Sequence, residues 1–562
     1  MIFIAYSQVS EEQLNHSLGM PEYSYYFVLR GFLPVLRELG QVILVSNPEQ
    51  EVDAIYNDCL KRGEECVFIS FSPPNKSVTG LCCPTICVFA WEFDRIPDEV
   101  WDGDPKNDWR YVFADHGRAI TLSQYSANAV KKAMGQNFPV TSIPVPVWDA
   151  FATYGSRHNQ FPAAKTEMAI RGNIIDSRNY VITPESFEIK NSFDGFNFKD
   201  FPGGKVRMGF SLTDEFQAYL GGFYEPESWG TWSRIEKPWV LLPYKVGGDI
   251  QVKIRFDGYA GNTDREISVS LGSEEKKIKI AGGFADADLS FHLSKPENVL
   301  KFSGLDLTPV PDAIDSRTMG IGLHSIELSA AAGQSDKMQA ADSGDSLRRV
   351  SLDGVVYTSV FNPDDARKNW VDMVKSFCAA FQDVEDATLV LKMTHHSVES
   401  FLGKMHLLLQ QMWPFKCRIV ALHGYLDDVE YEKLIAATSF YVNTSRCEGL
   451  CLPLMEFMSC GKPAIAPCHT SLADYVEKSS TLIVQSGVVP AIWPHDPRQL
   501  FRTLQYRIDC ESLMNAYRQS YEIVKNKPDA YRGMAKAAML KMKDYSSNRE
   551  VKKQLQRFLD VT

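Results

Sequence analysis

The chain lacks the features that draw proteins to membranes or to nucleic acid. Among its 562 residues, no apolar run comes near the roughly 20 residues that a membrane-spanning helix needs. The formal net charge is −11, so no overall positive field attracts nucleic acid or anionic lipid. Residues 1–6 carry no basic leader, which favours a buried first strand over an export signal. These absences predict a cytoplasmic protein without a nucleic acid partner.

Cysteine is missing from the middle of the chain. The twelve cysteines all lie before residue 90 or after residue 375. The tightest group, Cys82, Cys83 and Cys87, lacks a second ligand pair at the spacing that zinc sites use. We therefore expect reduced structural thiols rather than metal ligands or disulfides.

The two ends of the chain alternate short apolar runs with helical patterns, which predicts parallel sheets covered by helices. Near the N-terminus, strand patterns lie at 2–5, 41–45, 66–71, 86–90 and 119–122, and helical patterns at 22–39 and 124–134. After residue 350, strand patterns lie at 354–361, 387–393, 417–422, 439–443, 463–467 and 481–484. Helical patterns there lie at 365–381, 397–411, 427–437, 450–460 and in a long series from 497 onwards.

The middle of the chain has a different pattern. Between about 165 and 330, alternating segments such as 249–256 and 266–271 are separated by turn residues, and helical runs are few. Short strands of this kind predict an antiparallel sandwich. Residues 330–346 are rich in Ala, Gly, Ser and Asp, which is typical of a linker.

The most informative stretch begins where a predicted strand ends, near Asn443. A glycine-containing loop follows, and a helix starts near Leu450. Backbone N–H groups at the start of a helix are unpaired and lie at the positive end of its dipole, so the loop suits a diphosphate. Glu448 and Glu456 are eight positions apart, about 800° or close to two helical turns, so both lie near one face.

In chain order, the stretch contains Glu448, then Gly449-Leu450-Cys451-Leu-Pro, then Glu456 after seven intervening residues, then Gly-x-Pro-x-Ile-Ala. This order resembles the donor-binding signature of retaining glycosyltransferases of family 4, which have the GT-B fold. The resemblance implies a nucleotide-sugar donor, a catalytic Glu448 that reaches the sugar, and a Glu456 that binds the ribose. It places Gly449, Leu450 and Cys451 in the donor site. The other interpretation is an amphipathic helix with two solvated glutamates.

The same family usually places an arginine and a lysine in the first βα loop of this domain, where they neutralise the diphosphate. Lys368 fits the lysine position, with a catalytic role implied. Asn362 stands where the arginine is expected, and Lys392, at the end of a predicted strand, can supply the second charge. For each lysine, a solvated surface position is the alternative.

The N-terminal domain is expected to hold the acceptor. Gly19 lies in a loop that can approach the donor, and Glu22 follows it as an acceptor-binding residue. Trp91, Glu92 and Asp94 follow a predicted strand and resemble a Trp-Glu segment of some bacterial polysaccharide transferases. We expect Glu92 to act on the acceptor hydroxyl and Trp91 and Asp94 to bind the acceptor. A structural role is the alternative for both carboxylates.

The predicted fold is α/β: the GT-B fold, with two doubly wound parallel-sheet domains facing a cleft and an inserted antiparallel β-sandwich. The predicted parts are an N-terminal Rossmann-like acceptor domain, the β-sandwich, a linker, a C-terminal Rossmann-like donor domain, and a C-terminal helix that packs towards the N-terminal domain. Their ranges are 1–160, 165–335, 336–349, 350–545 and 546–562.

The resemblance also implies a mechanism and partners. Retaining members of this fold substitute at the front face, and the leaving diphosphate helps to deprotonate the acceptor hydroxyl. No cofactor and no metal are expected, since no Asp-x-Asp pair stands in a plausible βα loop. The acceptor is then a glycan or a lipid-linked oligosaccharide in bacterial O-antigen or capsule synthesis. The protein is either free in the cytoplasm or peripheral at the inner face of the membrane.

The middle domain resembles carbohydrate-binding modules embedded in bacterial polysaccharide-synthesis enzymes. Trp229 and Trp232 lie in a segment rich in aromatic residues and can stack on a growing glycan, although core aromatics of a sandwich are the other interpretation. A different class of function also stays open for the whole chain. It is a glycan-binding or scaffold subunit without catalysis, which the replacement at Asn362 favours and the two glutamates oppose.

Overall fold

A computed structural model of the chain has two compact units. It describes residues 1–9, 23–157, 162, 165–182, 187–189, 199–201, 204–211, 220–224, 226–311, 317–330, 347–394, 404–405, 408–409, 411–412 and 414–560. The first unit comprises Met1–Ala169, Arg349–His396 and Gly424–Thr562, and the second comprises Ile170–Arg348 and Ser397–His423. Gly19, Glu22 and most of the helix predicted at 397–411 lie outside the described residues.

The N-terminal part of the first unit is a six-stranded parallel sheet with the strand order β2-β1-β3-β4-β5-β6. β3 and β4 are buried along their whole length, because a parallel sheet covered on both faces needs continuous apolar runs. The strands are β1 (Ile2–Ser7), β2 (Gln41–Leu44), β3 (Cys66–Phe71), β4 (Thr85–Phe89), β5 (Ala119–Thr121) and β6 (Val140–Ser142). The helices are α1 (Tyr23–Leu39), α2 (Pro48–Arg62), α3 (Trp109–His116), α4 (Gln124–Met134) and α5 (Trp148–Arg157).

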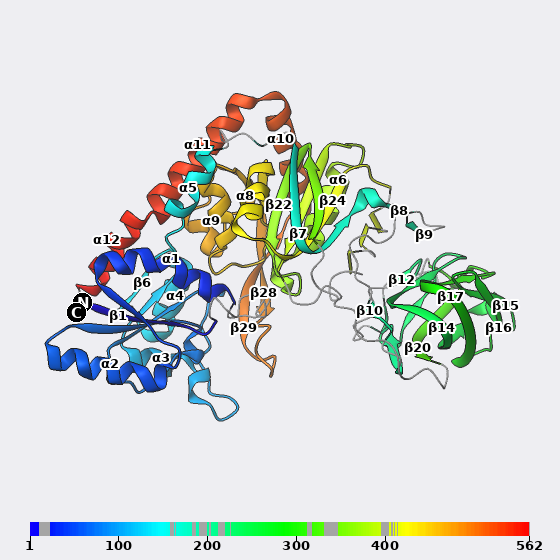
Figure 1. Cartoon of the computed structure of the whole chain (residues 1–562), viewed down its shortest axis with the longest axis horizontal. Helices are drawn as coiled ribbons and strands as arrows, with labels where there is room; N and C mark the ends of the chain where they lie inside the picture. Colours follow the sequence, from blue (N-terminus) through cyan, green and yellow to red (C-terminus); the bar gives the residue numbers. More distant parts are fainter. Residues whose placement is uncertain are drawn as a thin grey trace. The chain divides into compact units, whose positions relative to one another are not determined.

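A second parallel sheet in this unit contains the neighbouring strands β23-β22-β25-β26-β27. Its strands are β22 (Val355–Phe361), β23 (Ala387–Met393), β25 (Phe440–Val442), β26 (Ala464–Pro467) and β27 (Thr481–Val484). Its helices are α6 (Trp370–Ala380), α8 (Asp428–Ala437), α9 (Leu452–Ser459), α10 (Cys510–Asn526), α11 (Pro528–Ser546) and α12 (Asn548–Leu559). In Figure 1, α11 and α12 lead from this sheet back to α1. There Lys552 of α12 pairs with Glu38 at 3.0 Å.

The helical series predicted from 497 onwards was wrong at its start. An antiparallel hairpin of β28 (Ser486–Ile492) and β29 (Arg502–Ile508) comes first, and the helices begin only at Cys510. The Asp509 side chain accepts a hydrogen bond from Ser512 N–H and so caps α10. The helix predicted at 365–381 also starts later, at Trp370, because Asn369 has a left-handed backbone with φ 52°.

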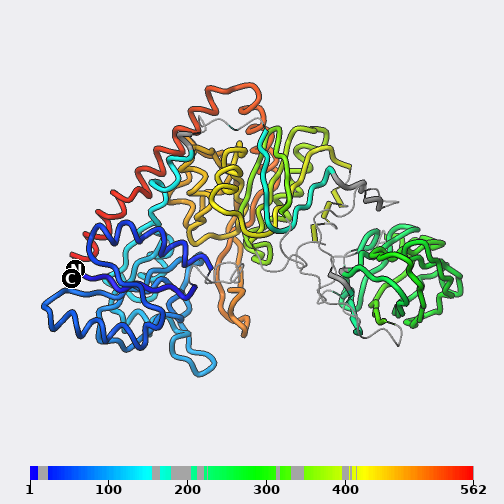
Figure 2. Tube along the Cα trace, viewed as in Figure 1, coloured from blue at the N-terminus to red at the C-terminus, as the bar shows by residue number. Residues whose placement is uncertain are grey.

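The second unit contains a mainly antiparallel sheet with the order β11-β20-β14-β17-β15-β16, to which β10, β12 and β13 add. Its buried apolar side chains form one continuous cluster, so this unit has a core of its own. Strands of the sheet are β10 (Lys199–Asp200), β11 (Val206–Gly209), β12 (Leu220–Gly221), β13 (Thr231–Trp232), β14 (Trp239–Gly258), β15 (Glu266–Leu271), β16 (Glu274–Lys279), β17 (Ala285–Ser303) and β20 (Ile321–Ala330). Figure 2 traces the backbone of this sheet in green, and β14 and β17 are its longest strands.

The remaining strands are β7 (Lys165–Asp176), β8 (Tyr180–Ile182), β9 (Phe187–Ile189), β18 (Thr308–Pro309), β19 (Thr318–Met319), β21 (Leu347–Asp353) and β24 (Arg418–Tyr425). Within the second unit, the Arg418 guanidinium forms a buried ion pair with Asp176 at 2.5 Å. The predicted α/β class with an additional antiparallel β domain is confirmed. Of the helices in the described ranges, none is both long and apolar enough to span a membrane.

Candidate functional site

The loop between β25 and α9 carries the predicted site. It ends at Cys451, which precedes the first residue of α9 and has a left-handed backbone with φ 66° and ψ 65°. The Cys451 side chain accepts no hydrogen bond from the start of the helix, and Pro453 occupies the first turn. The start of α9, at the positive end of the helix dipole, therefore has no side-chain cap from the residue that precedes it.

Glu448 lies in this loop and is almost completely buried, with 4% of its surface exposed. The Lys368 ammonium donates to both carboxylate oxygens, at 2.8 and 2.9 Å, and the Ser445 hydroxyl donates at 2.6 Å. Asn443 Nδ2 adds a fourth hydrogen bond at 3.2 Å. Burial alone would raise the pKa of Glu448, but Lys368 and the hydroxyl hold it below its usual value. Glu448 is therefore an ionised, fixed carboxylate.

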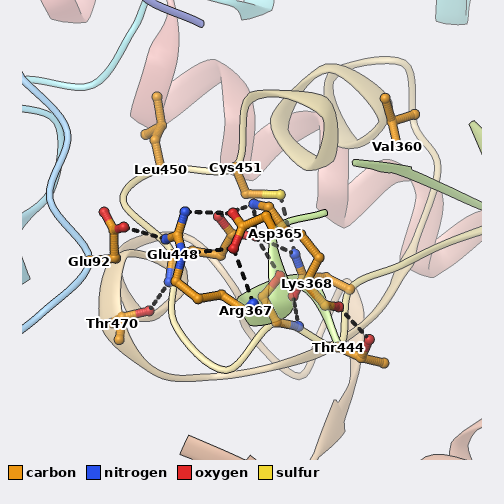
Figure 3. A network of polar contacts seen from close by, with 12 residues as sticks. Glu92, Val360, Asp365, Arg367, Lys368, Thr444, Glu448, Leu450, Cys451 and Thr470 are labelled. Atoms are coloured by element: carbon orange, nitrogen blue, oxygen red, sulfur yellow. Dashed lines mark hydrogen bonds and ion pairs between the residues drawn. The ribbon is translucent and has the colours of Figure 1, made fainter. Parts of the chain in front are cut away.

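Arg367 is a site residue that the sequence analysis missed. Its guanidinium forms ion pairs with Glu92 at 2.5 Å and with Asp365 at 2.6 Å. Arg367 and Lys368 belong to a 3₁₀ turn, Ala366–Lys368, directly after β22. Figure 3 shows Glu92, Asp365, Arg367, Lys368 and Glu448 converging on one another.

The Arg-Lys pair in the sequence was the signal for this residue, and the assignment of the expected arginine position to Asn362 stays a prediction. The Asn362 side-chain oxygen, Oδ1, accepts a hydrogen bond from Asp364 N–H at 3.1 Å, so this side chain shapes the turn. Arg367 supplies the guanidinium five residues later. The turn is closed against the Glu448 loop because Thr444 Oγ1 donates to Lys368 O at 3.1 Å.

The five charged groups of this network, called the ionic cluster below, comprise two cations and three carboxylates: Arg367 and Lys368, with Glu92, Asp365 and Glu448. Burial raises the pKa of Glu92 above its usual value, despite the neighbouring Arg367. The pKa values of Asp365 and Glu448 are lowered by the two cations against the effect of burial. Glu92 is therefore the member of the cluster that protonates most readily.

Glu456 lies outside the ionic cluster. The Tyr431 hydroxyl of α8 donates to its Oε2 at 2.6 Å. Burial raises the pKa of Glu456 to about 7, while the Tyr431 hydrogen bond and Arg30 of α1 lower it. The two glutamates of the predicted motif thus have opposite electrostatic surroundings.

Lys392 is buried at the end of β23, as the prediction of a strand-end cation requires. Its ammonium donates to Met393 O at 3.3 Å and to Thr394 Oγ1 at 3.4 Å. Burial lowers the pKa of Lys392 to about 8. No carboxylate pairs with it in the described part of the chain, so it is a cation with spare hydrogen-bonding capacity.

Gly449 and Leu450 bring the loop against the N-terminal sheet. A Cβ atom on Gly449 would lie 3.0 Å from Ala90 Cβ and 3.2 Å from Trp91 N, so only glycine fits this approach without displacing its neighbours. Leu450 O accepts a hydrogen bond from the Tyr475 hydroxyl at 2.7 Å. The loop is therefore fixed by both parallel sheets of the first unit.

Two residues predicted to bind the acceptor have structural partners. Trp91 is buried, donates from Nε1 to Arg95 O at 2.8 Å and packs on Trp109 with ring centroids 4.5 Å apart. Asp94 accepts from Thr503 Oγ1 at 2.9 Å and from Leu504 N–H at 3.0 Å, which ties β29 to the N-terminal sheet. Both side chains therefore have structural contacts, and their roles in acceptor binding stay predictions.

A segment that the sequence analysis did not select completes the surroundings of Glu448. Thr470, after β26, has a left-handed backbone with φ 49°, and its Oγ1 accepts from Glu448 N–H at 3.1 Å. Ser471 N–H donates to Glu448 O at 3.3 Å. The ring of His469 stacks on Tyr506 of β29, with centroids 4.1 Å apart and planes at 10°.

In the second unit, Trp229 and Trp232 lie outside the apolar core cluster and are half-buried. Their ring centroids are 5.0 Å apart, and Trp229 also contacts Phe284, which is 48% exposed. Trp229 Nε1 donates to Glu227 at 2.9 Å, and Arg317 pairs with the same carboxylate at 2.8 Å. These rings form a partly exposed patch rather than the interior of the β domain.

Two segments of the chain match known families. Residues 367–504 match the family described as glycosyl transferases group 1, and residues 206–330 match a domain of unknown function, DUF7024. No curated protein matches the chain significantly in sequence. The first match begins at Arg367 and includes Lys368, Glu448 and the start of the β28–β29 hairpin's second strand.

Solved structures with partial likeness include Alr3699/HepE of Anabaena in complex with UDP and glucose, at 14% identity and a TM-score of 0.28. The match covers 38% of this chain and 50% of that one. Sucrose-phosphate synthase of Thermosynechococcus elongatus matches at 17% identity and a TM-score of 0.27, covering 37% and 46% of the two chains. A glycosyltransferase of Rickettsia africae matches at 12% and 0.28, covering 37% and 48%. This chain thus spans about half the length of each. The first unit, with its two helix-flanked parallel sheets, thus has an α/β fold, and residues 367–504 are similar to the glycosyl transferases group 1 family.

Proposed function

We propose that this protein is a retaining glycosyltransferase that moves a sugar from a nucleotide-sugar to a glycan acceptor. The observation that carries the proposal is the buried pair of Lys368 and Glu448 beside the uncapped N-terminus of α9. A fixed cation, a fixed carboxylate and backbone N–H groups at a helix start are what a sugar diphosphate requires from its binding site. The group 1 family match over the same residues supports it.

In this proposal, different residues bind the diphosphate, the sugar and the ribose of the donor. Lys368, Arg367 and the first N–H groups of α9 neutralise the diphosphate, and Lys392 adds a further charge. Glu448 faces the transferred sugar, and Glu456 accepts hydrogen bonds from the ribose. Because the ionic cluster already has one carboxylate more than it has cations, an entering diphosphate must displace a carboxylate from Arg367. Glu92 is the group that leaves, since it is the one whose charge burial disfavours.

The proposed reaction breaks the bond between the anomeric carbon and the diphosphate oxygen and forms a bond from the same face to the acceptor oxygen. The acceptor hydroxyl proton passes to the departing diphosphate oxygen. Lys368 and Arg367 stabilise the negative charge that develops on that oxygen. Glu92, once released from Arg367, hydrogen-bonds the acceptor hydroxyl. The proposal assigns charge stabilisation to these side chains, with no cofactor or metal.

The acceptor in this proposal is a growing glycan or a lipid-linked oligosaccharide of bacterial surface polysaccharide, such as O-antigen or capsule. The partly exposed rings of Trp229, Trp232 and Phe284 support it, because aromatic faces stack on the apolar faces of sugars. The protein then works in the cytoplasm or at the inner face of the membrane.

A thermal-shift screen against UDP-, GDP-, ADP- and dTDP-sugars tests the proposal. A donor at 100 times its Kd stabilises the protein by about 2.7 kcal/mol, which raises the unfolding midpoint measurably. The stabilising donor is then incubated with glycan acceptors, and NMR of the product reads its anomeric configuration. Transfer with the donor's configuration supports the proposal; inversion refutes the retaining mechanism, and an absence of stabilisation by all four donors refutes the donor site.

A second candidate is a glycan-binding or scaffold subunit without catalysis. The excess of carboxylates around Arg367 favours it, because an ionic cluster with a net negative charge opposes a diphosphate. The two candidates differ in one measurement, the slow hydrolysis of the stabilising nucleotide-sugar without an acceptor. An enzyme hydrolyses it and loses this activity in Glu448→Gln, whereas a scaffold shows no hydrolysis in either form.

A further inference from the structure

The segment after β26 contains two buried polar side chains that lack hydrogen-bond partners. His469 is 4% exposed, and its Nε2 has no partner; Ser471 is fully buried, and its hydroxyl has none. A buried polar group left unpaired costs about 1–3 kcal/mol. Two such groups within three residues, beside the loop of Glu448, indicate a place that a ligand completes.

One nitrogen of the His469 ring has a hydrogen-bonding neighbour and the other has none. Thr470 Oγ1 accepts from Glu448 N–H at 3.1 Å and lies 3.3 Å from His469 Nδ1. In either tautomer of the neutral imidazole, Nε2 therefore has one unused hydrogen-bonding site, which a sugar hydroxyl can fill because it both donates and accepts. Burial lowers the pKa of His469 to about 4, so the ring stays neutral at physiological pH.

Three sets of contacts fix the position of residues 469–474. The His469 ring lies flat against Tyr506 of the β28–β29 hairpin. Thr470 and Ser471 bond the backbone of Glu448. In the third set, Asp474 accepts from Gln124 N–H at 2.8 Å, at the start of α4 in the N-terminal sheet domain.

The left-handed backbone of Thr470 is costly for a β-branched residue, and such conformations persist where the surroundings impose them. The imposed conformation is what directs Thr470 Oγ1 at the Glu448 N–H.

Resting on the donor site proposed above, we propose that His469 Nε2 and the Ser471 hydroxyl hydrogen-bond a hydroxyl group of the transferred sugar. A sugar hydroxyl fits better than the diphosphate for two reasons. The His469 ring is uncharged, and the Glu448 backbone separates this segment from Lys368, which binds the carboxylate end of Glu448. Because these two groups contact the sugar and not the nucleotide, they discriminate between donors that carry different sugars.

The test compares a nucleoside diphosphate with its nucleotide-sugar by isothermal titration calorimetry. The pairs are UDP and UDP-glucose, GDP and GDP-mannose, ADP and ADP-glucose, and dTDP and dTDP-glucose. His469→Ala should weaken binding of the nucleotide-sugar by about tenfold and leave binding of the free diphosphate within about twofold, since one hydrogen bond to the sugar is lost. His469→Gln, which keeps an amide that can donate or accept, should recover part of the difference.

Deoxy-sugar versions of the same donor locate the contact. The hydroxyl whose removal weakens wild-type binding, but no longer affects His469→Ala, is the one that His469 holds. His116→Ala is the matched control, because His116 is also a buried histidine with one unpaired nitrogen but lies in α3 and bonds Val78 O. It should change neither affinity.

The outcomes separate the two proposals. If the wild type binds none of the eight ligands, the donor site itself is refuted. If the wild type binds a nucleotide-sugar and His469→Ala binds both members of the pair as the wild type does, only the role of His469 is refuted. An equal loss for diphosphate and nucleotide-sugar also refutes it, because the contact would then not be to the sugar.

Discussion

The loop of residues 443–451 and the helix α9 that follows it each contain a glutamate, and the pKa values of these two carboxylates are shifted in opposite directions. In the loop, Glu448 has an ammonium, a hydroxyl and an amide around its carboxylate, and its pKa is lowered. In the helix, Glu456 has a single hydrogen bond from Tyr431, and burial raises its pKa to about 7. Two residues of one type, eight positions apart, therefore differ in their charge at neutral pH.

The difference follows from the elements that surround each carboxylate. The loop faces the turn after β22, where Arg367 is held by Asp365 and the backbone of Lys368 by the Thr444 hydroxyl. The side chain of Glu456 faces α8 and α1, which offer it one tyrosine and the distant charge of Arg30. A permanent charge is thus placed at the sugar end of the proposed donor site, and a titratable one at the nucleoside end.

Removing Lys368 should have the largest effect. In Lys368→Met, Glu448 remains buried without its counter-ion, so the free energy of unfolding should fall by about 3–5 kcal/mol. Urea unfolding of the full chain at pH 7.5 measures it. The double variant Lys368→Met with Glu448→Gln should recover most of the loss, because no unpaired charge remains. Lys61→Met is the control for an exposed pair, since Lys61 and Asp58 lie at the surface. If it costs as much as Lys368→Met, the buried pair has no special role.

Glu456 should give the donor affinity a pH dependence. At pH 8 its carboxylate is mostly ionised and can accept from ribose hydroxyls, whereas at pH 6 it is mostly protonated. Affinity for the nucleotide-sugar should therefore fall about tenfold from pH 8 to pH 6, because these values lie one pH unit above and one pH unit below the pKa of Glu456. Calorimetry with the nucleotide-sugar measures it, because its diphosphate does not titrate in this range.

Two variants define the source of this pH dependence. Glu456→Gln should bind weakly and equally at both pH values. Tyr431→Phe removes a hydrogen bond that lowers the pKa of Glu456, so the midpoint of the profile should move to higher pH. A profile that is the same in the wild type and in Glu456→Gln contradicts this assignment.

The sequence predicted those parts of the structure that depend on local patterns. β3 and β23 appear at the predicted residues because buried strands need continuous apolar runs. Lys368 and Glu448 were selected because a motif contains them, and the structure brings them into contact.

The missed features depend on contacts between distant residues. Asp94 bonds Thr503, a residue 409 positions away, and no local pattern shows that β29 lies there. Arg367 was passed over because neighbouring residues on a tight turn can point to different partners, and only the fold shows that Glu92 lies within reach. His469 follows no recognisable motif, and its missing hydrogen-bond partner is visible only in the structure.

The smallest expected effect concerns Cys451, where the loop of residues 443–451 meets α9. Cys451 adopts φ 66°, where an L-residue with a Cβ atom is strained by about 1–2 kcal/mol and glycine is not. Glycine also loses more entropy on folding, so Cys451→Gly should raise the free energy of unfolding by only about 0.5 kcal/mol.

Two control variants test this account. Cys510→Gly, at the ordinary first position of α10, should lower the free energy of unfolding by about 0.5–1 kcal/mol. Cys451→Ala keeps the strain and loses the contact of Sγ with Asn443, so it should be less stable than the wild type. If Cys451→Gly proves no more stable than Cys451→Ala, which also lacks the thiol, the left-handed backbone at this position is not strained enough to outweigh the entropy that glycine loses.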